Sequence, residues 1–219
     1  MLTAPVDVLT GAGFSKGDIH AFSLAKTNKL NGGSGGVSPR SAAKPAWVFL
    51  SYRQKDCVAE VSIVAEHIRR VHKARGDVFH DAEFHRDLAA LVSIMASSAN
   101  ALVFLSEDYF KSVYCLTELC TAVKHKANIG LVYIQKAGTS KDVDDHLRTF
   151  IAANAVSDAA AGSLLNAQGW VDLKTTGYDV ADVRAALRAI STLKMQRFSP
   201  GDAQLIREAE MEVIVQSLV

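Results

Sequence analysis

Residues 106–119 read SEDYFKSVYCLTEL and directly follow a short apolar run, ALVFL at 101–105. A run of this length that is apolar on both faces is typical of a buried strand in a parallel sheet. The segment behind it has helical spacing, and we expect a helix from about residue 112 to residue 126. A strand followed at once by a helix is the repeating unit of α/β proteins, so this stretch decides the fold prediction.

The same alternation continues on both sides of this stretch. We expect further strands at 47–50, 77–80, 129–134 and 170–173, and helices at 58–72, 87–98, 141–153 and 178–193. Five strand–helix units in series predict an α/β domain of flavodoxin type, with a doubly wound five-stranded parallel sheet.

The N-terminal part of the chain differs in composition from this domain. Residues 31–45, NGGSGGVSPRSAAKP, are rich in Gly, Ser and Pro, which predicts a flexible linker. Residues 1–30 are too few to build a core of their own. We therefore expect a largely disordered extension over 1–45 and the α/β domain over 46–195.

A C-terminal helix is expected within residues 196–219. Its start signal is Ser199-Pro200-Gly201-Asp202, which places Pro200 at the first helical position. One face of this helix is predicted to be apolar, and it either packs on the domain or contacts a partner. The residues of that face are Leu205, Ile206, Ala209, Val213 and Ile214.

Composition excludes several classes of protein. With 219 residues, 49% of them hydrophobic and 21% charged, the chain resembles an ordinary globular protein. A net charge of +1 gives no electrostatic reason to bind nucleic acid. No apolar run approaches the roughly 18 residues that span a bilayer, and no secretory signal is present. The three cysteines lack CxxC spacing, so we expect a cytoplasmic protein without a metal site.

Fold logic predicts where a ligand binds. In a flavodoxin-like sheet, ligands lie at the carboxyl ends of the strands where the strand order reverses, between the first and third strands. Ser51, Tyr52 and Arg53 leave the first strand at this edge, and Ser106 leaves the third. The topology is therefore expected to bring Arg53 and Ser106 toward one crevice, together with Tyr114 and Glu118 on the helix that follows the third strand.

The helix that follows the third strand carries the two most informative side chains. Tyr114 and Glu118 are four residues apart and so share a face of that helix. An aromatic ring that stacks on a base, beside a carboxylate that holds a sugar, suggests a nucleotide site. On the helical wheel Glu118 points away from the apolar face through Leu116, so a solvated surface glutamate is the alternative.

Three segments in order resemble motifs of the TIR (Toll/interleukin-1 receptor) domain family. They are VFLSYR at 48–53, VFHD at 78–81, and S-x-x-Y-x-x-S-x-Y-C-x-x-E-L at 106–119, where Tyr114 stands in place of the usual Trp. The resemblance covers about 46–195 and is strongest over 47–134. It implies the TIR variant of the flavodoxin-like fold, homotypic association into a homo-oligomer, and a part in signal transduction such as innate immunity.

TIR domains include enzymes that cleave NAD+ between nicotinamide and ribose, and the glutamate of C-x-x-E is their key residue. The resemblance therefore implies that Glu118 is catalytic, that Tyr114 stacks on an aromatic part of the dinucleotide, and that Arg53 lies near its phosphates or ribose. NAD+ is then a substrate, and no cofactor is implied. Further candidate binding residues are Ser51, Tyr52, Asp81 and Ser106.

Some of these candidates have a simpler structural interpretation. Asp81 is expected to fix its own loop, and Ser106 and Ser112 are expected to cap the helix. Two alternatives to the enzyme remain open. One is a non-catalytic TIR scaffold that signals through homotypic TIR–TIR contacts, and the other is a nucleotide-binding sensor on the same fold.

Overall fold

The computed structural model describes residues 46–73, 75–80, 88–106, 108–136 and 142–218. The predicted extension and linker at 1–45, and the candidate Asp81, lie outside the described residues.

The described residues form one five-stranded sheet in which all neighbouring strands are parallel. Its order is β2-β1-β3-β4-β5, so the chain reverses direction across the sheet beside β1. This order confirms the predicted flavodoxin-like class. The strands are β1 (Val48–Tyr52), β2 (Val78–His80), β3 (Asn100–Leu105), β4 (Asn128–Ile134) and β5 (Met195–Phe198).

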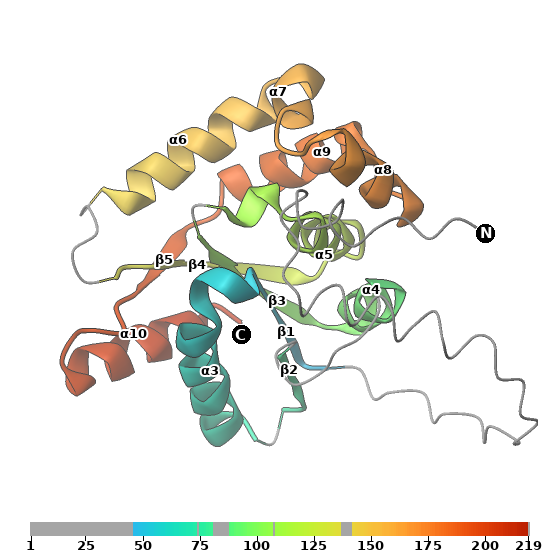
Figure 1. Ribbon diagram of the computed structural model, residues 1–219. Helices are drawn as coiled ribbons and strands as arrows, with labels where there is room; N and C mark the ends of the chain where they lie inside the picture. Colours follow the sequence, from blue (N-terminus) through green and yellow to red (C-terminus); the bar gives the residue numbers. More distant parts are fainter. Residues whose placement is uncertain (1–45, 74, 81–87, 107, 137–141, 219) are drawn as a thin grey trace, which may run out of the picture. The chain divides into compact units, whose positions relative to one another are not determined.

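Helices cover both faces of this sheet (Figure 1). One face carries α3 (Gln54–Val71) and α10 (Gln204–Gln216). The other face carries the remaining α-helices of the described residues, among which α4 and α5, and α6 and α9, are in contact. They are α4 (Leu88–Ser97), α5 (Val113–Lys124), α6 (Val143–Ala155), α7 (Asp158–Gly162), α8 (Ala167–Thr175) and α9 (Val180–Ser191).

Alternation along the strands divides the core between these two layers. Leu50 and Phe104 pack with apolar side chains of α3 and α10. Val103 and Leu105 point the other way and pack with α5, α6 and α9. Because successive side chains of a strand face opposite sides, strands covered by helices on both faces have to be apolar throughout. This is why the apolar runs predicted the inner strands.

The predicted fifth strand at 170–173 is wrong, because these residues belong to helix α8. The Asn166 side chain caps that helix by accepting a hydrogen bond from the Gly169 N–H at 2.8 Å. The helix ends just before Gly177, whose φ of +86° suits the residue after a helix C-cap. The fifth strand is instead Met195–Phe198, so the sheet continues past residue 195.

The C-terminal helix also starts later than predicted. Ser199 and Asp202 form a turn, in which the Asp202 N–H donates to the Ser199 carbonyl at 3.2 Å. The Ser199 N–H and hydroxyl both donate to the Glu210 carboxylate, which fixes this residue ahead of the helix. As a result α10 begins at Gln204, and Pro200 lies outside it.

The predicted apolar face of α10 is mostly not the face that packs. Ile214 is fully buried, as expected, but its buried neighbours are Met211 and Val215. Leu205 is 80% exposed, and Ile206 and Val213 are also exposed.

Two further observations concern the helices and the cysteines of the described residues. Among the described residues, no helix combines the length and the apolar character needed to cross a bilayer. Cys57, Cys115 and Cys120 are buried free thiols.

Candidate functional site

Glu118 is a buried carboxyl group. Helix α5 begins after Ser112, whose hydroxyl accepts from the Cys115 N–H at 3.4 Å, so the predicted cap at this residue is confirmed. Every residue of α5 from Cys115 to Ala122 is buried, since α4, α8 and α9 contact the helix in addition to the sheet. Glu118 is only 4% exposed, and the alternative of a solvated surface glutamate is therefore wrong.

A chain of hydrogen bonds fixes this carboxyl group from the sheet side. The Ser51 hydroxyl, at the end of β1, lies 2.6 Å from Glu118 Oε2 and donates to it. The Tyr109 hydroxyl lies 2.7 Å from Ser51 Oγ and 3.2 Å from the Cys115 carbonyl oxygen. Ser51 and Tyr109 are fully buried, so this chain is shielded from water.

The Tyr109 phenol remains protonated in this setting. Burial, followed by the nearby Cys115 and Glu118, raises the pKa of Tyr109 well above its usual range. Tyr109 is therefore a permanent hydrogen-bond donor to one of its two neighbours.

Tyr114 lies one helical turn before Glu118 and is 55% exposed. The two side chains share a face of α5, as predicted, but the ring reaches solvent where the carboxyl group does not. The two side chains of this predicted pair therefore differ sharply in their access to solvent.

Arg53 belongs to a second, more exposed network at the same strand ends. Its Nη1 lies 2.6 Å from Asp108 Oδ2 and 3.5 Å from Asp56 Oδ1. Lys111 also binds Asp108, at 2.7 Å. Desolvation lowers the pKa of Arg53, but its hydrogen bond to Asp108 and the two aspartate charges outweigh this and raise it. The guanidinium is therefore charged and already engaged by carboxylates.

Ser106 and Tyr52 take positions that the sequence did not predict. The Ser106 hydroxyl donates to Asp56 Oδ2, so it braces the Arg53 network and does not cap a helix. Tyr52 packs with the α3 face of the sheet and stacks on His80, with ring centroids 5.3 Å apart. Tyr52 thus faces away from Ser51 and Glu118, as alternation along β1 requires.

The buried thiols near the site are poor nucleophiles. Desolvation, and then the charge of Glu60, raises the pKa of Cys57 to about 12. Desolvation, and then Glu118, raises the pKa of Cys115 well above its usual range. Because the thiolate is the reactive form, this arrangement disfavours cysteine chemistry at the site.

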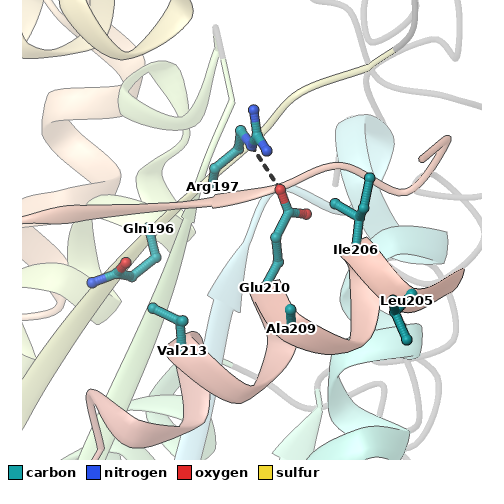
Figure 2. A pocket seen from close by; sticks show the side chains of 7 residues that line it. All are labelled: Gln196, Arg197, Leu205, Ile206, Ala209, Glu210 and Val213. Carbon is teal, nitrogen blue, oxygen red and sulfur yellow. Dashed lines mark hydrogen bonds and ion pairs between the residues drawn. The ribbon is translucent and has the colours of Figure 1, made fainter. Parts of the chain in front are cut away.

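A hollow of about 500 Å³ lies elsewhere, between β5 and α10 (Figure 2). Arg197 crosses it to bind Glu210, with Nε and Oε1 2.6 Å apart. None of the predicted site residues lines this hollow. The lining residues are Gln196, Arg197, Leu205, Ile206, Ala209, Glu210 and Val213.

The structure thus brings Ser51 and Glu118 into contact and places Arg53 two residues after Ser51, at the exit of β1. Sequence reasoning missed the roles of Tyr109 and Asp108. Both follow β3 directly, and their position at a strand exit beside a predicted ligand crevice was the available signal. Their partners are 58 and 55 residues away in sequence, so no local pattern could identify them.

Comparisons with known proteins find distant structural similarity. No protein-family model and no curated protein sequence matches the chain. Among solved structures, the chain is similar to the TIR domains in a structure described as the activated Roq1 resistosome directly recognizing the pathogen effector XopQ. The two chains are 17% identical over 78% of this chain and 98% of that one, with a TM-score of 0.46.

Proposed function

We propose that this chain is a TIR-domain NAD+ hydrolase that cleaves the bond between nicotinamide and ribose. The products are nicotinamide and ADP-ribose or a cyclic variant of it, and self-association activates the reaction. The observation that carries the proposal is the buried carboxyl group of Glu118, held by Ser51 at the exit of β1. This is the edge of the sheet at which ligands of doubly wound folds bind.

The reaction suits a single carboxylate. Nicotinamide leaves as a neutral base from a cationic ring, so its departure needs no general acid. Breaking the bond leaves positive charge on the ribose, and a carboxylate beneath the ring stabilises that charge as it develops. Removal of one such preorganised group typically costs roughly 3–4 kcal/mol, or about 10²–10³ in rate.

Tyr114 and Arg53 have roles that fit the rest of the dinucleotide. The exposed Tyr114 ring offers a face to an aromatic part of NAD+. Arg53 offers a guanidinium to a phosphate or the ribose, and the incoming group has to compete with Asp108 for it. This competition is consistent with a site that becomes active only after assembly.

The test is the release of nicotinamide from NAD+ by concentrated, crowded protein. We expect release by the unmodified chain and a loss of about 10²–10³ in kcat for Glu118→Gln, which preserves the shape of the side chain. Glu210→Gln is the matched control, because Glu210 is also largely buried but binds Arg197 instead. If the unmodified chain releases no nicotinamide, or if Glu118→Gln is as active as the control, the proposal is wrong.

The second candidate is a TIR scaffold that associates with other TIR domains without turnover. It is favoured by the apolar side chains that α10 exposes, with Leu205 80% exposed at the rim of the hollow in Figure 2. A silent but self-associating chain in the same assay supports this candidate.

A further inference from the structure

The hydrogen-bond chain through Ser51 has three contacts but only two hydroxyl protons, those of Ser51 and Tyr109. Ser51 and Tyr109 each carry one hydroxyl proton, yet together they make contacts to Glu118, to each other and to the Cys115 carbonyl. When Glu118 is ionised, Ser51 donates to it, and Tyr109 donates to Ser51. In this state the Ser51 hydroxyl proton points to the carboxylate. The Tyr109 hydroxyl proton points to Ser51 Oγ and not to the Cys115 carbonyl oxygen.

A protonated Glu118 reverses the direction of the chain. The carboxyl proton is then donated to Ser51 Oγ, Ser51 donates to the Tyr109 oxygen, and Tyr109 donates to the Cys115 carbonyl. Both directions leave no hydroxyl proton unpaired. Because an unpaired buried polar group is costly, the two directions are the stable states of this cluster, and they differ by the one proton on Glu118.

We propose that Ser51 and Tyr109 are positioning residues that hold Glu118 as an oriented carboxylate for the glycosidic bond cleavage proposed above. Tyr109 does so through Ser51, and its contact with the Cys115 carbonyl is the place to which its proton turns when Glu118 is protonated. The expected effect of Ser51 and Tyr109 on turnover rests on the proposed function. The ionisation of Glu118 in the substrate-free protein tests the rest.

The other charged and titratable groups around the chain come from several elements. They include Arg53 at the exit of β1, Cys57 on α3, and Cys115 and Cys120 on α5. Burial keeps the three thiols protonated, with the pKa of Cys57 and of Cys120 each raised to about 12. Arg53 keeps its charge, which Asp108 and Asp56 balance. Since the three thiols stay protonated and Arg53 stays charged, none of these four groups supplies the proton that reverses the chain.

The chain offers a matched pair of controls in the same layer, with Thr121 on α5 and Tyr178 just before α9. Thr121 and Tyr178 form a second buried contact between a hydroxyl and a tyrosine, with the two oxygens 2.9 Å apart. The Thr121 hydroxyl also donates to the Thr117 carbonyl at 2.7 Å, so this contact has partners other than Ser51 and Tyr109. Thr121→Val and Tyr178→Phe thus remove buried hydroxyls from the same layer without touching the positioning chain.

The experiment compares Ser51→Ala and Tyr109→Phe with these controls in two measurements. A ¹³C NMR titration of the full chain without NAD+ follows the protonation of the Glu118 carboxyl group. Loss of the Ser51 donor should shift its midpoint upward by about one pH unit, a tenfold gain in proton affinity, and Tyr109→Phe should shift it less in the same direction. The two controls should leave the midpoint unchanged.

Turnover is the second measurement. At neutral pH, kcat for nicotinamide release should fall by about 10- to 100-fold in Ser51→Ala, while KM changes by less than about threefold. If Ser51→Ala does not fold, Tyr109→Phe carries the test, since it keeps the ring and its edge contact with Phe110. Equal midpoints in all variants, or equal shifts in the controls, overturn the proposal. A chain that shows the shifts but releases no nicotinamide overturns the proposed function and leaves the positioning role standing.

Discussion

The ion pair between Arg53 and Asp108 makes a quantitative prediction about ligand affinity. A phosphate of NAD+ or ADP-ribose that binds the guanidinium has to displace a carboxylate 2.6 Å away. Asp108→Asn removes the competing charge and keeps the size of the side chain. The Arg53 and Asp108 side chains are 28% and 39% exposed, and pairs this accessible to water contribute about 0–1 kcal/mol. The Kd of ADP-ribose should therefore fall by up to about fivefold.

Isothermal titration calorimetry with ADP-ribose measures this change without requiring turnover. The gain should shrink at high salt, because exposed charges are screened. It should also vanish in an Arg53→Gln background, where the carboxylate has no guanidinium to occupy. Asp144→Asn controls for net charge, since Asp144 pairs with Arg148 at 2.8 Å on α6. If the Kd of ADP-ribose is unchanged or higher in Asp108→Asn, or falls equally in Asp144→Asn, Asp108 does not compete with the ligand for Arg53.

Three further predictions concern stability. Desolvation, and then the charge of Arg70, lowers the pKa of His67 below its ordinary 6.5, so the unfolded chain takes up a proton more readily there. This contribution to stability is present above pH 6.5 and is lost as the pH falls below it, and His67→Gln should flatten that slope in urea denaturation. Gly177→Ala places a side chain at a φ of +86° and should lower the free energy of unfolding by about 1 kcal/mol in thermal denaturation. Ile214→Ala should cost about 2–5 kcal/mol in the same assay, against less than about 0.5 kcal/mol for Leu205→Ala.

Each of these stability predictions has a contrary outcome. If the free energy of unfolding of His67→Gln depends on pH as steeply as that of the unmodified chain, groups other than His67 cause the loss of stability in acid. A neutral Gly177→Ala contradicts the left-handed backbone at the end of α8. Equal costs for Ile214→Ala and Leu205→Ala contradict the orientation of α10.

The sequence predicted the inner sheet because its strands are covered on both faces and have to be apolar at each position. It failed at β5, where Gln196 and Arg197 are not buried and interrupt the apolar run of an edge strand. The apolar segment Trp170–Leu173 was then assigned to the sheet, although Asn166, the N-cap of a helix, and Gly177, the residue after its C-cap, bracket it. Cap residues were the better signal there than hydrophobicity.

The sequence predicted at which edge of the sheet the candidate residues lie, but not which side chains are hydrogen-bonded to one another. The reversal of strand order beside β1 predicted that Arg53, Ser106, Tyr114 and Glu118 would approach one crevice. The hydrogen bond between Ser51 and Glu118 was not predicted, and Arg53 and Ser106 bind Asp108 and Asp56 instead. The burial of Glu118 was not predicted, because the helical wheel describes one helix alone, whereas in the fold Ser51 of β1 lies against this carboxyl group. The Tyr109 contact depends on the exit of β3 and has no local sequence signal.

The central claim is that the Glu118 carboxylate cleaves the bond between nicotinamide and ribose. The most direct measurement is the rate of nicotinamide release at saturating NAD+ for the unmodified chain and for Glu118→Gln, with both proteins concentrated to the same degree. We expect measurable release by the first and a rate about 10²–10³ lower for the second. Equal rates, or no release by either protein, would contradict it.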